Sequence, residues 1–406
     1  MKILVVGINY SPERVGIGKY TTEMCEHLVG CGHEVTAVTS FPYYPEWRVP
    51  IAYRNRFFLT ERIKGVTVKR AYLYVPSKVT ARTRMLHELS FILFSFLNLL
   101  MAGNADVLIA ISPPLGIGLV AHLIAEIKRI PFTFHVHDLQ PDTAVDLGMI
   151  KNGPFVRLLY GIEKFIYRKA AFVSTISETM RRKIIAKGIE PEKVVLFPNW
   201  VDTKFIYPME RENVFRKEHG LDGEFLVIYS GNIGVKQGLD VILDVAEKTR
   251  DMRDIIYLIV GDGADKERLI RRYNEMSLGN VRFLPVQEPE MLPYLLSAAD
   301  VSVVPQQKAV TEVVMPSKLT GILASGRPVI AAADRGSEMN EVIAGNRCGL
   351  VVEPENAVEM LDALMFLYRN GIAREEFGKT AREYAIKNLP KDAVLAPYEK
   401  RIRQTE

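Results

Sequence analysis

The feature that most constrains the fold is a regular alternation of short Val/Ile-rich strands with amphipathic helices. In the first half the predicted strands are 2–7, 34–39, 106–111, 132–135, 171–175 and 193–197. In the second half they are 225–230, 255–260, 300–304, 328–332 and 348–352. Strands separated by helices form parallel sheets that are covered on both faces. The chain is therefore expected to be α/β.

The alternation occurs twice, and 406 residues exceed one ordinary core, so we expect two doubly wound, Rossmann-like domains. Residues 1–200 would form the first domain and residues 201–373 the second. The remaining segment, 374–406, has no strand to return to and is expected to pack back on the first domain. Open parallel sheets bind ligands at the carboxyl ends of their strands. Two such sheets facing each other would form one cleft, with a site from each domain.

Composition and charge limit the compartment and the partners. None of the three cysteines lies in a C-x-x-C or Cys/His cluster, which favours a reducing cytoplasm and predicts no metal site. Residues 1–200 carry 25 Lys and Arg against 16 Asp and Glu. Such a basic half can be a plain solvated surface or can meet anionic lipid or a phosphorylated substrate. Nucleic acid is not an expected partner.

The segment 91–102 contains only two polar side chains in twelve residues. This run is shorter than the roughly 20 residues that span a bilayer. It is either a buried core helix or, with the preceding basic residues, a helix that lies on an anionic membrane face. The membrane alternative would place the protein at the inner face of the plasma membrane.

Residues 315–326, "MPSKLTGILASG", predict a helix whose start can bind an anion. The backbone N–H groups of Ser317, Lys318 and Leu319 would be free there, and the lysine adds a full positive charge. Gly321 weakens such a helix by about 1 kcal/mol relative to alanine. Either close approach of a ligand or close packing of the helix explains this glycine.

A second signal is "LVIYSGNIGVKQGLD", residues 226–240, in which a predicted strand runs into a loop with Gly231 and Gly234. Glycines let backbone amides approach a phosphate. The pattern is neither a P-loop nor G-x-G-x-x-G, so an ATPase or a dinucleotide-binding fingerprint is not supported. Lys236 and Gln237 stand within reach of a diphosphate. A further glycine loop, "VGDGAD", leaves the next strand at the same end of the sheet.

In the first half, "PFTFHVHDLQPD" places His135, His137 and Asp138 at the end of a predicted strand. One face of the strand can present both imidazoles, but no third metal ligand lies at a suitable spacing. Near the N-terminus, "SPERVGIGKY" sets Gly16 and Gly18 between the first strand and the first helix, followed by Lys19. This loop also lies at the expected ligand edge.

Five segments in this order resemble GT-B glycosyltransferases of family 4, a large retaining class. They are "SPERVGIGKYTTEMCEHLVGCGHEVTAVTS", "FPNWVD", "SGNIGVKQGLD", "VGDG" and "PSKLTGILASGRPVIA". Within the class, "GINYSPE", "FPYYPEW" and "FPNW" resemble the colanic-acid biosynthesis (fucosyl)transferases and the O-antigen transferases that use amino-sugar donors. The resemblance covers nearly the whole chain.

The resemblance implies that the second domain binds a nucleoside-diphosphate sugar. The diphosphate would lie on the amides of Ser317–Leu319 and on the loop Gly231–Gly234, and the base would contact Val286. The first domain would receive the acceptor. His137 matches the histidine that relatives place near the reacting sugar, and Asp138 would orient it or a sugar hydroxyl.

Two departures from the family pattern concern charged positions. The second of two expected glutamates falls on Gly321, and Glu312 is only a near match for the first. The usual Arg and Lys of the phosphate loop fall on Asn232 and Gln237, so Lys236 and Lys318 would supply their charge.

We therefore expect a retaining, metal-independent glycosyltransferase of the hexosyltransferase type that needs no cofactor. Its donor would be GDP-fucose or a UDP-sugar, and its acceptor a lipid-diphosphate-linked or growing saccharide of exopolysaccharide or O-antigen biosynthesis. The alternatives are a nucleotide-sugar epimerase of the same fold and a non-catalytic nucleotide-sugar-binding protein.

Overall fold

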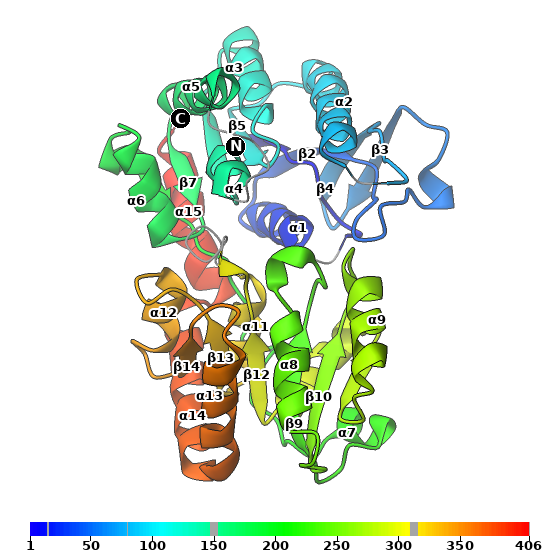
Figure 1. The fold of residues 1–406 in the computed structure, drawn as a ribbon. Coiled ribbons are helices and arrows are strands. Elements are labelled where there is room, and N and C mark those ends of the chain that lie inside the picture. Colours follow the sequence, from blue (N-terminus) through cyan, green and yellow to red (C-terminus); the bar gives the residue numbers. More distant parts are fainter. Residues whose placement is uncertain (14–15, 79, 147–152, 309–315, 406) are drawn as a thin grey trace. The chain divides into compact units, whose positions relative to one another are not determined.

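The structure is a computed structural model, and it describes residues 1–13, 16–78, 80–146, 153–308 and 316–405. The chain divides into two compact units. One comprises Met1–Pro198 together with Leu395–Glu406, and the other comprises Asn199–Val394. Each unit is a sheet with helices on both of its faces (Figure 1).

The sheet of the first unit has eight strands in the order β3-β4-β2-β1-β5-β6-β7-β8. Only β3 runs antiparallel, against β4; the other neighbours are parallel, and Val6 of β1 lies between Val38 and Ala110. The strands are β1 (Lys2–Val6), β2 (Glu34–Ser40), β3 (Phe58–Ile63), β4 (Val66–Ala71), β5 (Val107–Ser112), β6 (Phe132–Val136), β7 (Val173–Thr175) and β8 (Val194–Leu196).

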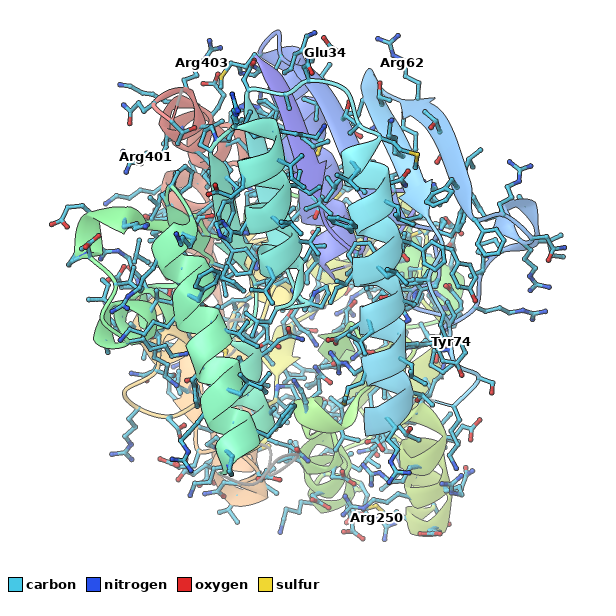
Figure 2. The ribbon with its side chains drawn as sticks, turned by 90° about the horizontal axis from the view of Figure 1, so that it is seen from above. Glu34, Arg62, Tyr74, Arg250, Arg401 and Arg403 are labelled. Carbon is cyan, nitrogen blue, oxygen red and sulfur yellow. The ribbon has the colours of Figure 1, made fainter. Side chains whose placement is uncertain are left out.

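The helices of the first unit are α1 (Gly16–Gly30), α2 (Ala81–Leu100), α3 (Ile117–Lys128), α4 (Gln140–Asp146), α5 (Pro154–Lys169) and α6 (Glu178–Ala186), with short 3-10 turns η1 (Ile51–Tyr53) and η2 (Pro191–Lys193). Figure 2 shows α2, α3 and α5 side by side on the face turned to the viewer. The middle helix, α3, packs against both α2 and α5. Thr80 caps α2 by accepting a hydrogen bond from the Thr83 N–H at 3.3 Å. No described helix combines the length and the hydropathy that crossing a membrane requires.

The sheet of the second unit has six parallel strands in the order β11-β10-β9-β12-β13-β14. They are β9 (Phe225–Ser230), β10 (Ile255–Val260), β11 (Val281–Leu284), β12 (Val301–Val304), β13 (Val329–Ala332) and β14 (Gly349–Val352). Strand order reverses between β9 and β12. The carboxyl ends of these two strands are therefore where such a sheet binds ligands.

The helices of the second unit are α7 (Val214–His219), α8 (Asp240–Lys248), α9 (Lys266–Met276), α10 (Leu292–Ala298), α11 (Lys318–Ala324), α12 (Glu338–Ile343), α13 (Ala357–Arg369) and α14 (Gly371–Asn388), with 3-10 turns η3 (Val235–Gln237) and η4 (Pro289–Met291). The last helix, α15 (Lys391–Arg403), begins in the second unit and ends in the first.

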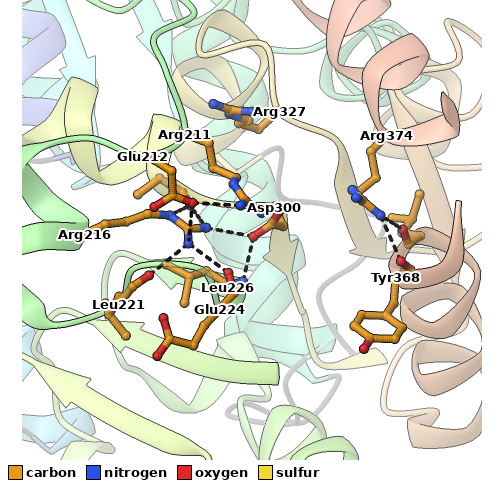
Figure 3. Close-up of polar contacts among 12 residues, drawn as sticks. Arg211, Glu212, Arg216, Leu221, Glu224, Leu226, Asp300, Arg327, Tyr368 and Arg374 are labelled. Carbon is orange, nitrogen blue, oxygen red and sulfur yellow. Dashed lines mark hydrogen bonds and ion pairs between the residues drawn. The ribbon is translucent and has the colours of Figure 1, made fainter. Parts of the chain in front are cut away.

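A buried arginine fixes the starts of β9 and β12. The Arg216 guanidinium is fully buried and donates to the Ala298 carbonyl at 3.0 Å and to an Asp300 carboxylate oxygen at 2.8 Å (Figure 3). The same oxygen of Asp300 accepts the Leu226 N–H at 2.8 Å. A buried charge is tolerated only when it is paired and hydrogen-bonded. These contacts hold together the two strands whose far ends form the candidate site.

The predicted α/β class with two parallel sheets is confirmed, and each predicted strand overlaps an observed one. Sequence reasoning missed β3, β4 and β11. It also expected 374–406 as a whole to join the first domain. Instead α14 packs within the second unit, where the Arg382 side chain donates to the carbonyls of Ile206 and Ala324, and only residues from Leu395 onward belong to the first.

Candidate functional site

Two glycine loops meet at the carboxyl end of the second sheet. The N–H of Gly231 donates to the Val260 carbonyl at 3.0 Å, so the loop after β9 is joined to the end of β10. A Cβ added at Gly261 would lie 1.9 Å from the Gly231 carbonyl oxygen, and one at Gly263 would lie 2.3 Å from the carbonyl oxygen of Ile233. Only glycine permits this approach, because any larger residue would collide with backbone. The expectation that both loops share one end of one sheet is confirmed.

This contact predicts a large loss of stability for Gly261→Ala. The backbone at residue 261 has φ +149°, and the new methyl group would overlap the Gly231 carbonyl. We expect the free energy of unfolding to fall by about 3 kcal/mol in urea denaturation. Gly279→Ala is the matched control, since nothing lies within 4 Å of a Cβ at residue 279. Equal stabilities of the two variants would contradict the packing described here.

Lys318 places an amine beside the first glycine loop. Its Nζ lies 3.8 Å from the centroid of the Tyr229 ring, and a Cβ at Gly231 would be 3.0 Å from it. The Nζ is buried and has no hydrogen-bond partner among the described residues. Burial lowers the pKa of this amine to about 7. A buried cation without a partner is costly, so an anion bound at the loop would relieve the cost.

The start of α11 corrects part of the expected anion site. The helix begins at Lys318, and the Leu319 N–H donates to the Pro316 carbonyl at 3.1 Å. The expectation of three free amides is therefore wrong at Leu319, because a tight turn precedes the helix. Leu319 itself is buried in the core.

Gly321 faces packed side chains and not open space. A Cβ there would lie 3.3 Å from Cδ1 of Leu296 and 3.6 Å from Cδ1 of Ile206. Both leucine and isoleucine belong to the apolar cluster beneath α11. Of the two explanations for this glycine, close packing of the helix is the one that the structure supports.

Two side-chain amides gather at the second glycine of the loop. A Cβ at Gly234 would lie 2.9 Å from Nδ2 of Asn232 and 2.8 Å from Oε1 of Gln237. That Oε1 is buried and has no hydrogen-bond partner among the described residues. The Lys236 carbonyl accepts the Gln307 N–H at 3.0 Å, which ties the loop to the segment after β12. The loop thus presents a side-chain amide N–H donor, from Asn232, and a side-chain amide oxygen acceptor, from Gln237.

Two other predicted site residues, Val286 for the base and Glu312 as a catalytic carboxylate, are less informative. Val286 follows β11 and is 56% exposed. Glu312 lies outside the described residues.

In the first unit, the two histidines at the end of β6 differ in their surroundings. His135 is buried, and its Nδ1 lies 2.9 Å from the Ser174 hydroxyl. The ring of His137 stands nearly perpendicular to that of His135, with centroids 4.3 Å apart. Burial lowers the pKa of His137 to about 3, so its imidazole is neutral at physiological pH. Asp138 accepts a hydrogen bond from the Thr143 hydroxyl at 2.6 Å.

Within the described ranges, no group of three or more His, Cys, Asp or Glu side chains is arranged to hold a metal ion.

The loop after β1 is organised by a glutamate that sequence reasoning missed. Glu13 is buried, and one carboxylate oxygen accepts the N–H groups of Tyr43 and Tyr44, each at 2.8 Å. A Cβ at Gly18 would lie 3.1 Å from the Glu13 carbonyl oxygen, so this predicted acceptor residue is held against the same turn. Gly16 begins α1 with φ +57°, and Lys19 lies over the Tyr20 ring at 5.5 Å.

An aromatic cluster lies on the segment that Glu13 holds. The ring of Tyr43 is 4.6 Å from that of His87 and 5.5 Å from that of Trp47. Trp47 adopts φ +51°, which is rare for a bulky residue and marks a constrained position. The available signals were the "SPE" and "FPYYPEW" segments, but their contact is long-range and no local pattern shows it.

Comparisons with known proteins agree with this arrangement. A family model described as "Glycosyl transferase 4-like domain" matches residues 15–200, and one described as "Glycosyl transferases group 1" matches residues 211–384. WcaI of Escherichia coli (strain K12), a glycosyl transferase named for colanic acid biosynthesis, is 36% identical over 99% of this chain and 100% of its own length.

Solved structures show the same fold. Sucrose-phosphate synthase from Thermosynechococcus elongatus matches with a TM-score of 0.79 at 18% identity, covering 100% of this chain and 98% of that one. Anabaena HepE, solved in complex with UDP-glucose, matches with a TM-score of 0.74 at 14% identity over 100% of both chains. These structures show that the fold is GT-B, and the two family models together with the full-length relative define a glycosyltransferase. The chain belongs to glycosyltransferase family 4.

Proposed function

We propose that the protein moves a sugar from a nucleoside-diphosphate sugar, either GDP-fucose or a UDP-sugar, onto a lipid-diphosphate-linked or growing saccharide. Exopolysaccharide or O-antigen biosynthesis is the proposed pathway class. The relative WcaI is named for colanic acid biosynthesis, and the structural neighbour HepE was solved with UDP-glucose. The observation that carries the proposal is the buried Lys318 amine beside the glycine loop, which no described residue hydrogen-bonds.

The second unit would bind the donor. Lys318 would pair with the diphosphate, while Gly231 allows the phosphates to approach the backbone. Asn232, Lys236 and Gln237 border the same loop, and Ser317 precedes the lysine. The base would contact the exposed Val286. These groups would stabilise the negative charge on the leaving diphosphate. No divalent ion would then be needed, and we propose that transfer is metal-independent.

The first unit would bind the acceptor. In the reaction the C1–O bond to the donor phosphate breaks and a C1–O bond to an acceptor hydroxyl forms. The hydroxyl proton passes to the departing diphosphate, and attack from the same face retains the anomeric configuration. Neutral His137 would donate a hydrogen bond to the reacting sugar, with Asp138 beside it. Gly16, Gly18 and Lys19 would shape the acceptor side. A lipid-linked acceptor places the protein at the inner face of the plasma membrane.

A thermal-shift panel with UDP, GDP, UDP-glucose and GDP-fucose tests donor binding. We expect the nucleotides of one base, uridine or guanosine, to raise the melting temperature. Transfer to a lipid-linked saccharide should persist in the presence of a chelator. NMR of the product should show that the anomeric configuration of the sugar is retained. If no nucleotide stabilises the protein, the proposal fails. Donor isomerised without an acceptor would identify an epimerase, and binding without turnover a nucleotide-sugar-binding protein.

A further inference from the structure

The solvent side of α2 is apolar from Met85 to Leu100. Six of its side chains, each between 39% and 58% exposed, recur at helical spacing on that side: Met85, Leu86, Leu89, Leu93, Leu97 and Leu100. The opposite side is buried, with Phe91, Ser95 and Leu99 in the core. A helix of a soluble protein usually turns polar residues outward. This helix therefore presents large apolar side chains to the solvent as well as to the core.

Two neighbouring helices continue the exposed surface. Their exposed apolar residues are Leu119, Leu123 and Ile127 on α3, and Phe155, Leu158 and Phe165 on α5. The three helices pack closely because of two glycines. A Cβ at Gly116 would lie 2.7 Å from Cδ1 of Ile92 on α2, and one at Gly118 would lie 2.6 Å from Cγ2 of Ile166 on α5. In Figure 2 the three helices lie side by side on the face turned to the viewer.

We call these twelve residues the three-helix face. Each leaves about half of a large apolar side chain in contact with solvent. Together they expose apolar surface on the order of 1,000 Å², whereas monomeric soluble proteins rarely expose patches above a few hundred Å². A surface of this size indicates an interaction site.

Positive charges accompany the three-helix face. Arg82 and Arg84 are exposed at the start of α2, and Arg157, Arg168 and Lys169 are exposed on α5. Apolar side chains among cations suit a bilayer with anionic headgroups, where the apolar groups enter the interface and the cations meet the lipid charge.

Most acidic side chains on these helices are either paired with a cation or buried away from solvent. Glu163 of α5 is buried, with one oxygen 2.6 Å from the Lys187 Nζ, and Glu88 of α2 accepts from Arg84 at 3.3 Å. Among the described residues of α2, α3 and α5, Glu126 is the only exposed acid, and its carboxylate lies 3.9 Å from the His122 Nδ1. A second copy of the chain would bring like charges together across a two-fold interface, which is unfavourable. Charge thus favours lipid over self-association.

We propose that the three-helix face docks the first unit onto an anionic lipid bilayer. This inference rests on the proposed function, since a lipid-linked acceptor gives the docking its purpose. It depends on none of the donor residues, all of which lie in the second unit.

Vesicle sedimentation tests the proposal with the full chain. The vesicles are phosphatidylcholine alone, and phosphatidylcholine mixed with phosphatidylglycerol. We expect binding to the mixed vesicles, a loss of at least about tenfold in Leu89→Gln/Leu93→Gln, and loss of the lipid preference in Arg168→Glu/Lys169→Glu. Ile372→Gln is the control, because Ile372 is 72% exposed on α14 of the second unit and should not affect binding.

Several outcomes overturn the proposal. They are absent binding, equal binding to both vesicles, or an equal loss in Ile372→Gln. A dimer that Leu89→Gln/Leu93→Gln dissolves would assign the face to a second copy of the chain. Thermal shifts with UDP-glucose and GDP-fucose on the same variants separate the two proposals. A nucleotide shift without vesicle binding rejects docking alone, and vesicle binding without any nucleotide shift rejects the proposed function alone.

Discussion

Replacing Lys318 with methionine is expected to abolish donor binding and sugar transfer while raising the melting temperature of the ligand-free protein. The amine is buried and has no hydrogen-bond partner in the part of the chain that the structure describes, so its removal relieves a cost in the free state. The same amine is the proposed partner of the diphosphate, so its removal should lower kcat/KM by at least about 100-fold. Transfer assays and thermal melts of the same preparation measure both effects.

The pH dependence gives this prediction a second readout. The pKa of Lys318 is about 7 in the folded, ligand-free protein, well below the value of 10.5 for a free lysine. A diphosphate binds the ammonium form, so donor affinity should fall about tenfold for each pH unit above 7. In Lys318→Met the affinity should be weak and flat across this range.

The stability of the ligand-free protein should rise with pH, whereas the donor affinity should fall. Because the folded pKa lies below the unfolded one, the unfolded state binds more protons between pH 7 and 10.5. The buried ammonium therefore destabilises the wild type most at pH 7 and below, and the advantage of Lys318→Met should shrink as the pH rises. Lys248→Ala, at an exposed position on α8, is the control. Full activity in Lys318→Met would remove the basis of the proposed donor site.

Replacing His137 with alanine is expected to lower kcat about 100-fold with little change in the donor KM. A hydrogen bond made in the transition state typically contributes this much. The pKa of His137 is about 3, so the neutral ring would act as a hydrogen-bond donor and not as a titrating acid. Between pH 5 and 8 the rate should therefore show no step that disappears in His137→Ala. Steady-state kinetics across this range provide the measurement.

His135 supplies a matched comparison for this prediction. It lies two residues away but is buried against the Ser174 hydroxyl, so His135→Ala should lower the melting temperature. His137→Gln keeps a hydrogen-bond donor and should recover part of the rate. Wild-type turnover in His137→Ala would show that this ring does not touch the reacting sugar.

Most of the fold could be predicted because buried parallel strands are continuous apolar runs. β5 (Val107–Ser112) and β10 (Ile255–Val260) are buried throughout and stand out in the sequence. The missed strand β3 reads "FLTERI" and alternates between exposed and half-buried residues at the sheet edge. The missed strand β11 is only four residues long. Short or one-sided strands carry too few apolar residues to be distinguished from loops.

The candidate site could be predicted less completely. The glycine loops and Lys318 were visible because glycine and an unusual helix start leave local signals. The engagement of the Leu319 N–H by Pro316 was not visible, since it depends on one turn of backbone geometry. The role of Glu13 depends on residues thirty positions away. A carboxylate that organises a distant loop has no spacing rule that sequence alone can show.

The divided first unit has a consequence for biosynthesis. Tyr398 stacks on Phe197 with ring centroids 3.7 Å apart, and Glu399 lies 2.7 Å from the His33 imidazole. Tyr398 and Glu399 are synthesised only after the whole of the second unit has emerged from the ribosome. The first-made half of the protein thus acquires its final pieces last, whereas the later-made half, Asn199–Val394, is one uninterrupted stretch of chain.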